Sequence, residues 1–278
     1  MATNADQLSI TFLQNHPETA ANVLEGIAAA DVVDLLVPLP IRISAAVIKY
    51  MPSNKASQIT RMITAEKQSL LFQDMGLQHA ALILRHFTKK ECEEIIMVLP
   101  TTFAIRLRLL LQYPSGSVGS VMNPDIIIVV LENRVSEVIG KIQQLVKVDD
   151  PDIYIVDKEE RFMGCVQSLQ LLQSDPQTTM ASLLDSGVTS VPARMSLEAL
   201  IEDNQWVARQ HLPVVDRNQH LVGSISFSDV KGYQPPEEII FQEERHLPVE
   251  IVSLYWKGWL SILNTLFANS SSQRDSAN

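Results

Sequence analysis

A hydroxyl and a carboxylate stand three residues apart at Ser226 and Asp229, directly after the apolar run that ends at Ile225. If a helix begins at this point, the two side chains share one face of its first turn. A hydroxyl donates and accepts hydrogen bonds and a carboxylate accepts them, so the pair could bind the vicinal hydroxyls of a ribose. The second interpretation is structural, because serine and aspartate also cap the N-termini of helices.

The segment around this pair has an earlier copy in the chain. Asp216 ends an apolar run and is separated by a polar loop from Gly223, and Asp157 and Gly164 recur in the same order 59 residues earlier. Each copy is typical of two short β-strands joined by a loop and followed by a helix. A repeat of this length indicates two small α/β units that pack against each other.

Residues 1–112 have a different pattern. Their apolar residues recur at three- and four-residue spacing, which is typical of amphipathic helices. Thr88 and Glu91 form a capping box before one such stretch, and breaks fall at Pro17, Pro40, Pro52, Gly76 and Pro100. The pattern predicts a superhelix of short antiparallel helices, whose outer surface would contact other proteins. His79 and His86 could share a helix face, but they lack a third ligand and we interpret them as structural.

The stretch 113–120 is rich in glycine and serine, and it indicates a domain boundary or a hinge. Beyond it the pattern alternates between strands and helices. In the first α/β unit we expect a strand, a helix and a hairpin at 126–131, 135–146 and 153–166. In the second, after a lead-in segment at 180–184, we expect a strand at 189–192 and a helix at 197–209, before the hairpin that begins near 212.

These features resemble a known family. The order of Gly119, Met122 and Pro124, a helix, an apolar-Val-Asp run and a glycine-led segment resembles a tandem CBS pair. Together with the superhelix and the junction YPSGSVGSVMNP, the stretch from about 15 to 230 looks like the cytosolic part of MgtE-type magnesium transporters. The implied fold class is α plus α/β: an MgtE-N-like helical superhelix at 1–112, then a tandem CBS (Bateman) pair at 113–233. The units would span about 118–175 and 176–233, and an acidic linker, amphipathic helix and tail would follow at 234–278.

The resemblance implies two candidate ligands, of which the first is an adenine nucleotide. In the first unit Gln167 and Gln170 replace the hydroxyl and the carboxylate, so that at most one adenosine site is expected. Its candidate residues, all in the second unit, are Ser226, Asp229, Thr189 and Val191.

Magnesium is the second candidate ligand. Transporters of this family sense it with carboxylates at domain interfaces, where a hard cation binds oxygen ligands. Carried over by position, the candidate metal ligands are Glu198, Asp229 and Glu237. Other acids of the family are absent, so that a magnesium site here would be weakened or lost; the replacements are Ser196, Ala208, Gly232 and, at the junction, Ser115 and Gly116.

The family's pore would follow this region, but residues 251–267 instead predict an amphipathic helix, since polar residues interrupt the apolar run. Such a helix could lie on a membrane, dock on a partner protein or fold back on its own core. Two pairs of acids precede it and favour a protein contact over an anionic membrane; they are Glu237, Glu238, Glu243 and Glu244.

Composition narrows the function further. A net charge of −10 argues against a nucleic-acid partner, and two distant cysteines without a signal peptide indicate a reducing, cytoplasmic location with peripheral membrane contact as an option. No nucleophile–base pattern or P-loop is present, so an enzyme is not expected. We therefore expect a regulatory protein whose CBS pair binds Mg²⁺ or another small ligand and forms a homodimer. Its superhelix or C-terminal helix would contact a protein partner. The alternatives are an adenine-nucleotide-binding module and a non-binding dimeric scaffold.

Overall fold

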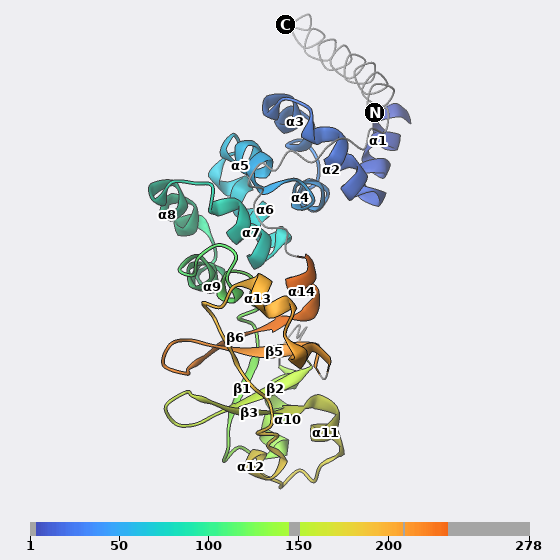
Figure 1. The fold of residues 1–278 in the computed structure, drawn as a ribbon. Coiled ribbons are helices and arrows are strands. Elements are labelled where there is room, and N and C mark those ends of the chain that lie inside the picture. The colour runs from blue at the N-terminus through green and yellow to red at the C-terminus, as the bar shows by residue number, and fades with distance from the viewer. Residues whose placement is uncertain (1–3, 145–150, 208, 233–278) are drawn as a thin grey trace, which may run out of the picture.

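The computed structural model describes residues 4–144, 151–207 and 209–232. Figure 1 shows the helices of the first domain at one end of an elongated molecule, followed by two small three-stranded sheets. The second sheet in chain order lies next to the helices, and the first sheet lies at the far end. Glu237 and the predicted C-terminal amphipathic helix fall outside the described residues.

Within the described residues the first domain contains nine helices. They are α1 (Asn4–Asn15), α2 (Pro17–Glu25), α3 (Ala29–Leu36), α4 (Ile41–Lys49), α5 (Ser53–Arg61), α6 (Ala65–Met75), α7 (Leu77–Leu84), α8 (Lys89–Val98) and α9 (Thr101–Leu111). The predicted breaks lie between helices. Pro17 is the first residue of α2, and Gly76 separates α6 from α7. The other three prolines, Pro40, Pro52 and Pro100, directly precede α4, α5 and α9. The predicted capping box of Thr88 and Glu91 is confirmed at the start of α8.

The helices pack in two rows. Each helix from α2 to α7 packs against the helix two positions further along, so that α2, α4, α6 and α8 form one row and α3, α5, α7 and α9 the other. The space between the rows is filled by apolar side chains such as Phe72 and Leu84, both fully buried. Since no single short helix can bury its apolar face alone, the stacking of the rows supplies the core, as the sequence pattern predicts.

The two α/β units have the same topology. The first sheet contains β1 (Ile127–Val130), β2 (Asp152–Val156) and β3 (Phe162–Gln167), and the second contains β4 (Val191–Pro192), β5 (His211–Val215) and β6 (Leu221–Ser226). In each, the first two strands are parallel and the last two antiparallel. The accompanying helices are α10 (Val135–Gln143), α11 (Ser168–Gln173), α12 (Met180–Leu183), α13 (Leu197–Ile201) and α14 (Phe227–Gly232).

One predicted helix is wrong in its second half. We expected a helix over 197–209, but α13 ends at Ile201 and a separate 3₁₀ turn spans Asn204–Val207. The side chain of Asp203 explains the break, because its Oδ1 accepts a hydrogen bond from the amide of Gln205 at 2.9 Å. Aspartate favours such local turns over a continuing helix.

The recurring aspartates organise the hairpin loops. Asp157 Oδ1 accepts hydrogen bonds from two amides of its own loop at 2.8 and 2.9 Å, and Asp216 Oδ1 does the same at 2.8 and 2.9 Å. The tips of the two loops also pair with each other, since the amide of Phe162 donates to Gln219 O and that of Leu221 donates to Glu160 O. These contacts tie the two units together at their hairpins.

The recurring glycines mark a crossing of the two units. The segment that precedes each unit's first strand runs to the hairpin of the other unit, forming the bridges Cys165↔Asp185 and Asn123↔Ser224. At both crossings a Cβ atom has no room. On Gly164 it would lie 2.4 Å from the carbonyl oxygen of Asp185, and on Gly223 2.7 Å from that of Asn123. The repeat detected in the sequence therefore reflects two equivalent close backbone approaches.

The junction after α9 is packed and hydrogen-bonded. The amide of Val118 donates to Met195 O at 2.9 Å and that of Gly119 to Ala193 O at 2.7 Å. Tyr113 and Met122, at its two ends, are buried in the core of the second unit. Whereas the sequence indicated a boundary or a hinge here, the structure fixes this segment to the second unit.

The crossing predicts opposite effects for two Gly→Ala substitutions. Gly223→Ala should lower the free energy of unfolding by about 1–3 kcal/mol, because the methyl group must displace backbone atoms. Gly140→Ala, in α10 where nothing lies within 4 Å of the added Cβ, should raise it by about 0.5–1 kcal/mol. Urea unfolding followed by circular dichroism measures both, and equal stability of the Gly223 variant and the wild type would contradict the close approach.

Candidate functional site

The predicted nucleotide residues of the second unit gather at one end of its sheet. β6 ends at Ser226, which pairs with His211 at the start of the central strand β5. β4 runs parallel to β5, so that Thr189, just before β4, lies toward the same end. Thr189 is exposed. Val191 is 2% exposed and packs in the core, so that only its backbone is available to a ligand.

Ser226 and Asp229 form a reciprocal cap on α14. The amide of Asp229 donates to Ser226 Oγ at 3.1 Å, and Asp229 Oδ2 accepts from Ser226 Oγ at 2.6 Å and from the Ser226 amide at 3.4 Å. The structural interpretation of this pair is therefore confirmed. Its role toward a ribose stays a prediction.

Two aromatic rings flank this end of the sheet. Phe227, the first residue of α14, is 38% exposed, and its ring centroid lies 5.3 Å from that of Trp206. Trp206 is held in place by a hydrogen bond from its Nε1 to Leu200 O at 2.7 Å. The exposed ring of Phe227, which packs against the hydrogen-bonded Trp206, therefore offers a surface on which a flat ligand can stack.

The corresponding end of the first unit carries a charged network. Arg209 of the second unit reaches Asp152, at the start of β2, with an N···O distance of 3.4 Å, and it also contacts Asp185 and the Sγ of Cys165. Burial, together with the nearby Asp152, raises the pKa of Cys165 to about 11, so that this thiol stays protonated. Gln167 pairs with Asp152 across β2 and β3, which places the arginine close to the glutamine copy of the motif.

The predicted metal ligands are not gathered into a cluster. Among the described residues, no group of three or more histidine, cysteine, aspartate or glutamate side chains is placed to hold a metal ion. Glu198 is exposed in the first turn of α13, and α13 packs against α14, which carries Asp229. Ser196, at a position where the family has an acid, caps α13 through its Oγ.

Asp229 lies at the contact between the second unit and the helical domain. Its charge acts on His79 of α7, as does that of Lys49 at the end of α4, and Figure 1 shows α14 directly beneath these helices. Burial is the main cause that lowers the pKa of His79 to about 4; Lys49 acts in the same direction and Asp229 opposes it. His79 is thus neutral at pH 7, and it senses the charge of a residue that sequence spacing alone did not connect to it.

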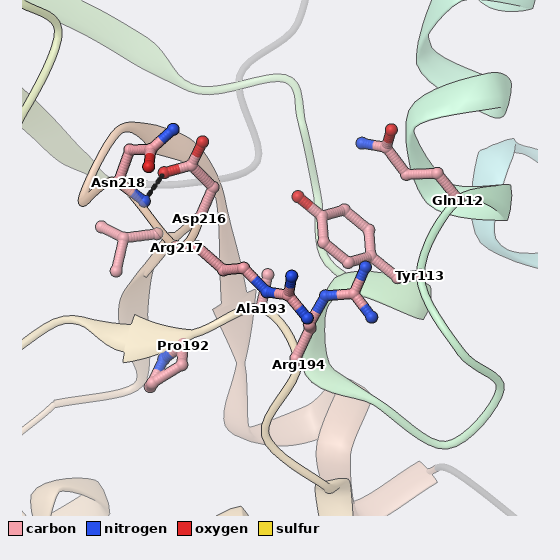
Figure 2. Close-up of a pocket in the computed structure, with 9 residues that line it drawn as sticks. Gln112, Tyr113, Pro192, Ala193, Arg194, Asp216, Arg217 and Asn218 are labelled. Carbon is pink, nitrogen blue, oxygen red and sulfur yellow. Dashed lines mark hydrogen bonds between the residues drawn. The ribbon is translucent and has the colours of Figure 1, made fainter.

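A cleft opens at the opposite end of the same sheet. It encloses about 310 Å³ and lies at the carboxyl ends of the parallel strands β4 and β5, between Arg194, Arg217 and the end of α9 (Figure 2). Its other walls are formed by Gln112, Tyr113, Pro192, Ala193, Val215, Asp216 and Asn218. Sequence reasoning missed this cleft. The available signal was that loops after parallel strands meet at one edge of a sheet, where ligands of α/β proteins bind.

The helical domain is similar to a known protein family. Residues 15–116 match the model of the MgtE intracellular N domain. The magnesium transporter MgtE of Bacillus subtilis is 19% identical over 226 residues, which are 75% of this chain and 49% of that protein. MgtE of Thermus thermophilus is 28% identical over 130 residues, 44% of this chain and 27% of that protein. The matches thus span about half or less of the length of these relatives.

Solved structures support the fold of the whole described chain. The cytosolic domain of the Mg²⁺ channel MgtE in complex with ATP superposes with a TM-score of 0.55 at 20% identity, over 82% of this chain and 99% of that chain. The soluble part of a magnesium transporter superposes with a TM-score of 0.56 at 16% identity, over 81% and 95%. The predicted fold class, a helical domain followed by a CBS pair, is confirmed. In the described part of the chain no helix combines the length and the apolar character needed to cross a bilayer.

The burial of His79 predicts a pH effect on stability. Because the pKa of His79 is lower in the folded chain than its ordinary value of 6.5, the unfolded chain binds the proton first as the pH falls. Stability should therefore decrease between about pH 6.5 and 4, by at most about 1.4 kcal/mol per pH unit from this group, and be unaffected by it above 6.5. The variant His79→Gln should show a flatter dependence in urea unfolding, and a slope identical to the wild type would exclude the histidine as its source.

Proposed function

We propose that this chain, an MgtE intracellular N domain followed by a CBS pair, is a regulatory module that reports ligand binding through the contact between its two parts. The observation that carries this proposal is the position of Asp229. It is the candidate ligand residue of the second unit, and its charge also acts on His79 of the helical domain. A ligand that engages this carboxylate changes the electrostatics of the domain contact at the same time.

An adenine nucleotide is the ligand that the geometry favours. Ser226, Asp229 and Thr189 lie toward one end of the second sheet, next to the exposed ring of Phe227. Hydroxyl and carboxylate groups suit a ribose, and the aromatic ring suits an adenine. A structure with the same fold was solved in complex with ATP, which supports this choice. The charged network at Arg209 supports a single site, in the second unit.

Magnesium is the second candidate, and it is favoured by the identity of the relatives, which are magnesium transporters. Glu198 and Asp229 come from neighbouring helices of the second unit, and Glu237 would complete the predicted set. Mg²⁺ retains several waters and needs only one or two carboxylates, so that two acids suffice for a weak site. In either case the module has no catalytic step, acts in the cytoplasm and transmits its state to a partner protein.

We also propose that two copies associate through the CBS pair. On α11 the side chains of Leu169 and Leu172 are 64% and 69% exposed, while Leu171 is buried. Residues three apart share one face of a helix, so that α11 presents two leucines to solvent on the face opposite its core. A second copy would cover them.

The nucleotide proposal predicts that the affinity for nucleotide depends on Asp229 and not on Gln170, the residue at the equivalent position of the first unit. Asp229→Asn should weaken AMP or ATP binding at least about tenfold, because a charged hydrogen-bond acceptor for the ribose is lost. Gln170→Ala, at the equivalent position 59 residues earlier, should leave the affinity unchanged. Isothermal titration of the EDTA-treated protein measures both, with MgCl₂ titrated separately.

Each result of the titrations has a defined meaning. Nucleotide binding that survives Asp229→Asn would place the nucleotide elsewhere. Saturable magnesium binding that is lost in the same variant, without nucleotide binding, would favour the second candidate. Absence of both nucleotide and magnesium binding would favour the remaining alternative, a dimeric scaffold that binds no small ligand.

The dimer proposal predicts a change of mass on disruption of α11. The double variant Leu169→Glu/Leu172→Glu should raise the dissociation constant of the dimer at least about tenfold, since two carboxylates would have to be buried without partners. Ile105→Glu, at a residue of α9 that is 61% exposed, should not. Sedimentation equilibrium distinguishes the cases, and a wild-type chain that stays monomeric at high concentration would refute the proposal.

A further inference from the structure

We propose that the cleft between Arg194 and Arg217 is a second ligand site, and that it binds a small molecule bearing a phosphate group. It lies at the carboxyl ends of β4 and β5, whereas the predicted nucleotide residues lie at the other end of the sheet. The two sites are therefore separated by the length of the strands.

Three separate segments of the chain build the cleft. Arg194 follows β4, Arg217 lies in the loop between β5 and β6, and Tyr113 comes from the junction after α9. Figure 2 shows the side chains of the two arginines extending toward one another, with the ring of Tyr113 beyond them. Apolar walls are supplied by Pro192, Ala193 and Val215. The result is a cleft with a basic mouth and an apolar floor.

The lining of the cleft carries more positive than negative charge, since Arg194 and Arg217 face a single carboxylate, that of Asp216. In the described residues, neither Arg194 nor Arg217 makes an ion pair or a side-chain hydrogen bond. Asp216 is the one acidic residue among those lining the cleft. Its Oδ1 accepts the amides of Asn218 and His220, and its Oδ2 lies 3.3 Å from His220 Nδ1. The carboxylate is thus hydrogen-bonded within its own loop, although its charge also acts on Tyr113.

An anion with two or more charges fits this arrangement best. Two guanidinium groups directed into one cleft repel each other, and an anion shared between them relieves the repulsion. Arginine presents paired N–H donors that match the oxygens of phosphate. The volume of about 310 Å³ exceeds that of inorganic phosphate and lies at the lower end of the range for small-molecule sites. The chemistry is therefore a phosphate group, either free or carried by a small organic molecule.

The cleft also contacts the junction between the two domains. Tyr113 packs directly over Gly119, where an added Cβ would lie 2.5 Å from the tyrosine ring. The amide of Gly119 is in turn bonded to Ala193 O, beside Arg194. A phosphate held by the arginines would therefore contact both the second unit and the end of the helical domain, and it would strengthen their attachment.

Titration with inorganic pyrophosphate and, separately, orthophosphate tests the site. The full chain is used in magnesium-free buffer, at constant ionic strength set with NaCl, by isothermal titration calorimetry. Saturable binding is expected for the wild type. Arg194→Gln and Arg217→Gln should each weaken it at least about tenfold, through loss of a charge-assisted hydrogen bond, and the double variant should abolish it. Tighter binding of pyrophosphate than of orthophosphate would point to a larger phosphorylated molecule, and equal binding to free phosphate.

Two control variants separate this site from general charge effects and from the nucleotide proposal. Arg42→Gln removes one positive charge from an exposed position in the first turn of α4 and should leave pyrophosphate binding unchanged, as should Asp229→Asn. Absence of saturable binding, retention of binding in the double variant, or an equal loss in Arg42→Gln would overturn the proposal. Loss only in Asp229→Asn would assign the phosphate to the other end of the sheet. Circular dichroism melting confirms that each variant is folded.

Discussion

Two close approaches of backbone to backbone hold the described fold together. At Gly164 and at Gly223 the segment that leads into one α/β unit pairs with the hairpin of the other, at a distance that excludes any side chain. Each unit is therefore completed by residues that precede its partner. The same crossing draws the junction after α9 into the core of the second unit, where Tyr113 and Met122 are buried. As a consequence the junction that follows the helical domain packs into the second unit, although the first unit follows it in the sequence.

The duplicated units have diverged in their charges while keeping this framework. In the second unit a hydroxyl and a carboxylate cap α14, and the carboxylate also acts on His79 across the domain contact. In the first unit Gln167, the counterpart of the hydroxyl, lies near Arg209, which is already paired with Asp152 and Asp185. An arginine with two carboxylate partners has little to gain from a further anion. The asymmetry is the reason that we propose a ligand role for the second unit and not for the first.

The features that could be predicted from the sequence are those that depend on residues close together in the chain. Proline breaks, the capping box at Thr88 and the repeated aspartate and glycine depend on nearby backbone, and their spacing revealed them. The helix over 197–209 failed because Asp203 captures an amide two residues on, a competition that apolar periodicity does not register. The effect of the Asp229 charge on His79 and the cleft of Tyr113, Arg194 and Arg217 join residues about 80–150 positions apart. No spacing rule encodes such pairs; they follow from the crossing of the units.

The second sheet meets the helical domain from both of its ends. At one end the charge of Asp229 in α14 acts on His79 of α7, and at the other end the cleft includes Tyr113 and Gln112, the residue that caps the end of α9. The junction between them is hydrogen-bonded to the loop that carries Arg194. A ligand at either end therefore acts on the same body, the second unit, and on its attachment to the same helices. If binding at one end shifts that attachment, the affinity at the other end must change by the same factor, because coupling between two sites is reciprocal. Nucleotide and phosphate titrations performed each in the presence of the other would then report a single coupling free energy, which measures how strongly the two sites influence each other through the domain contact.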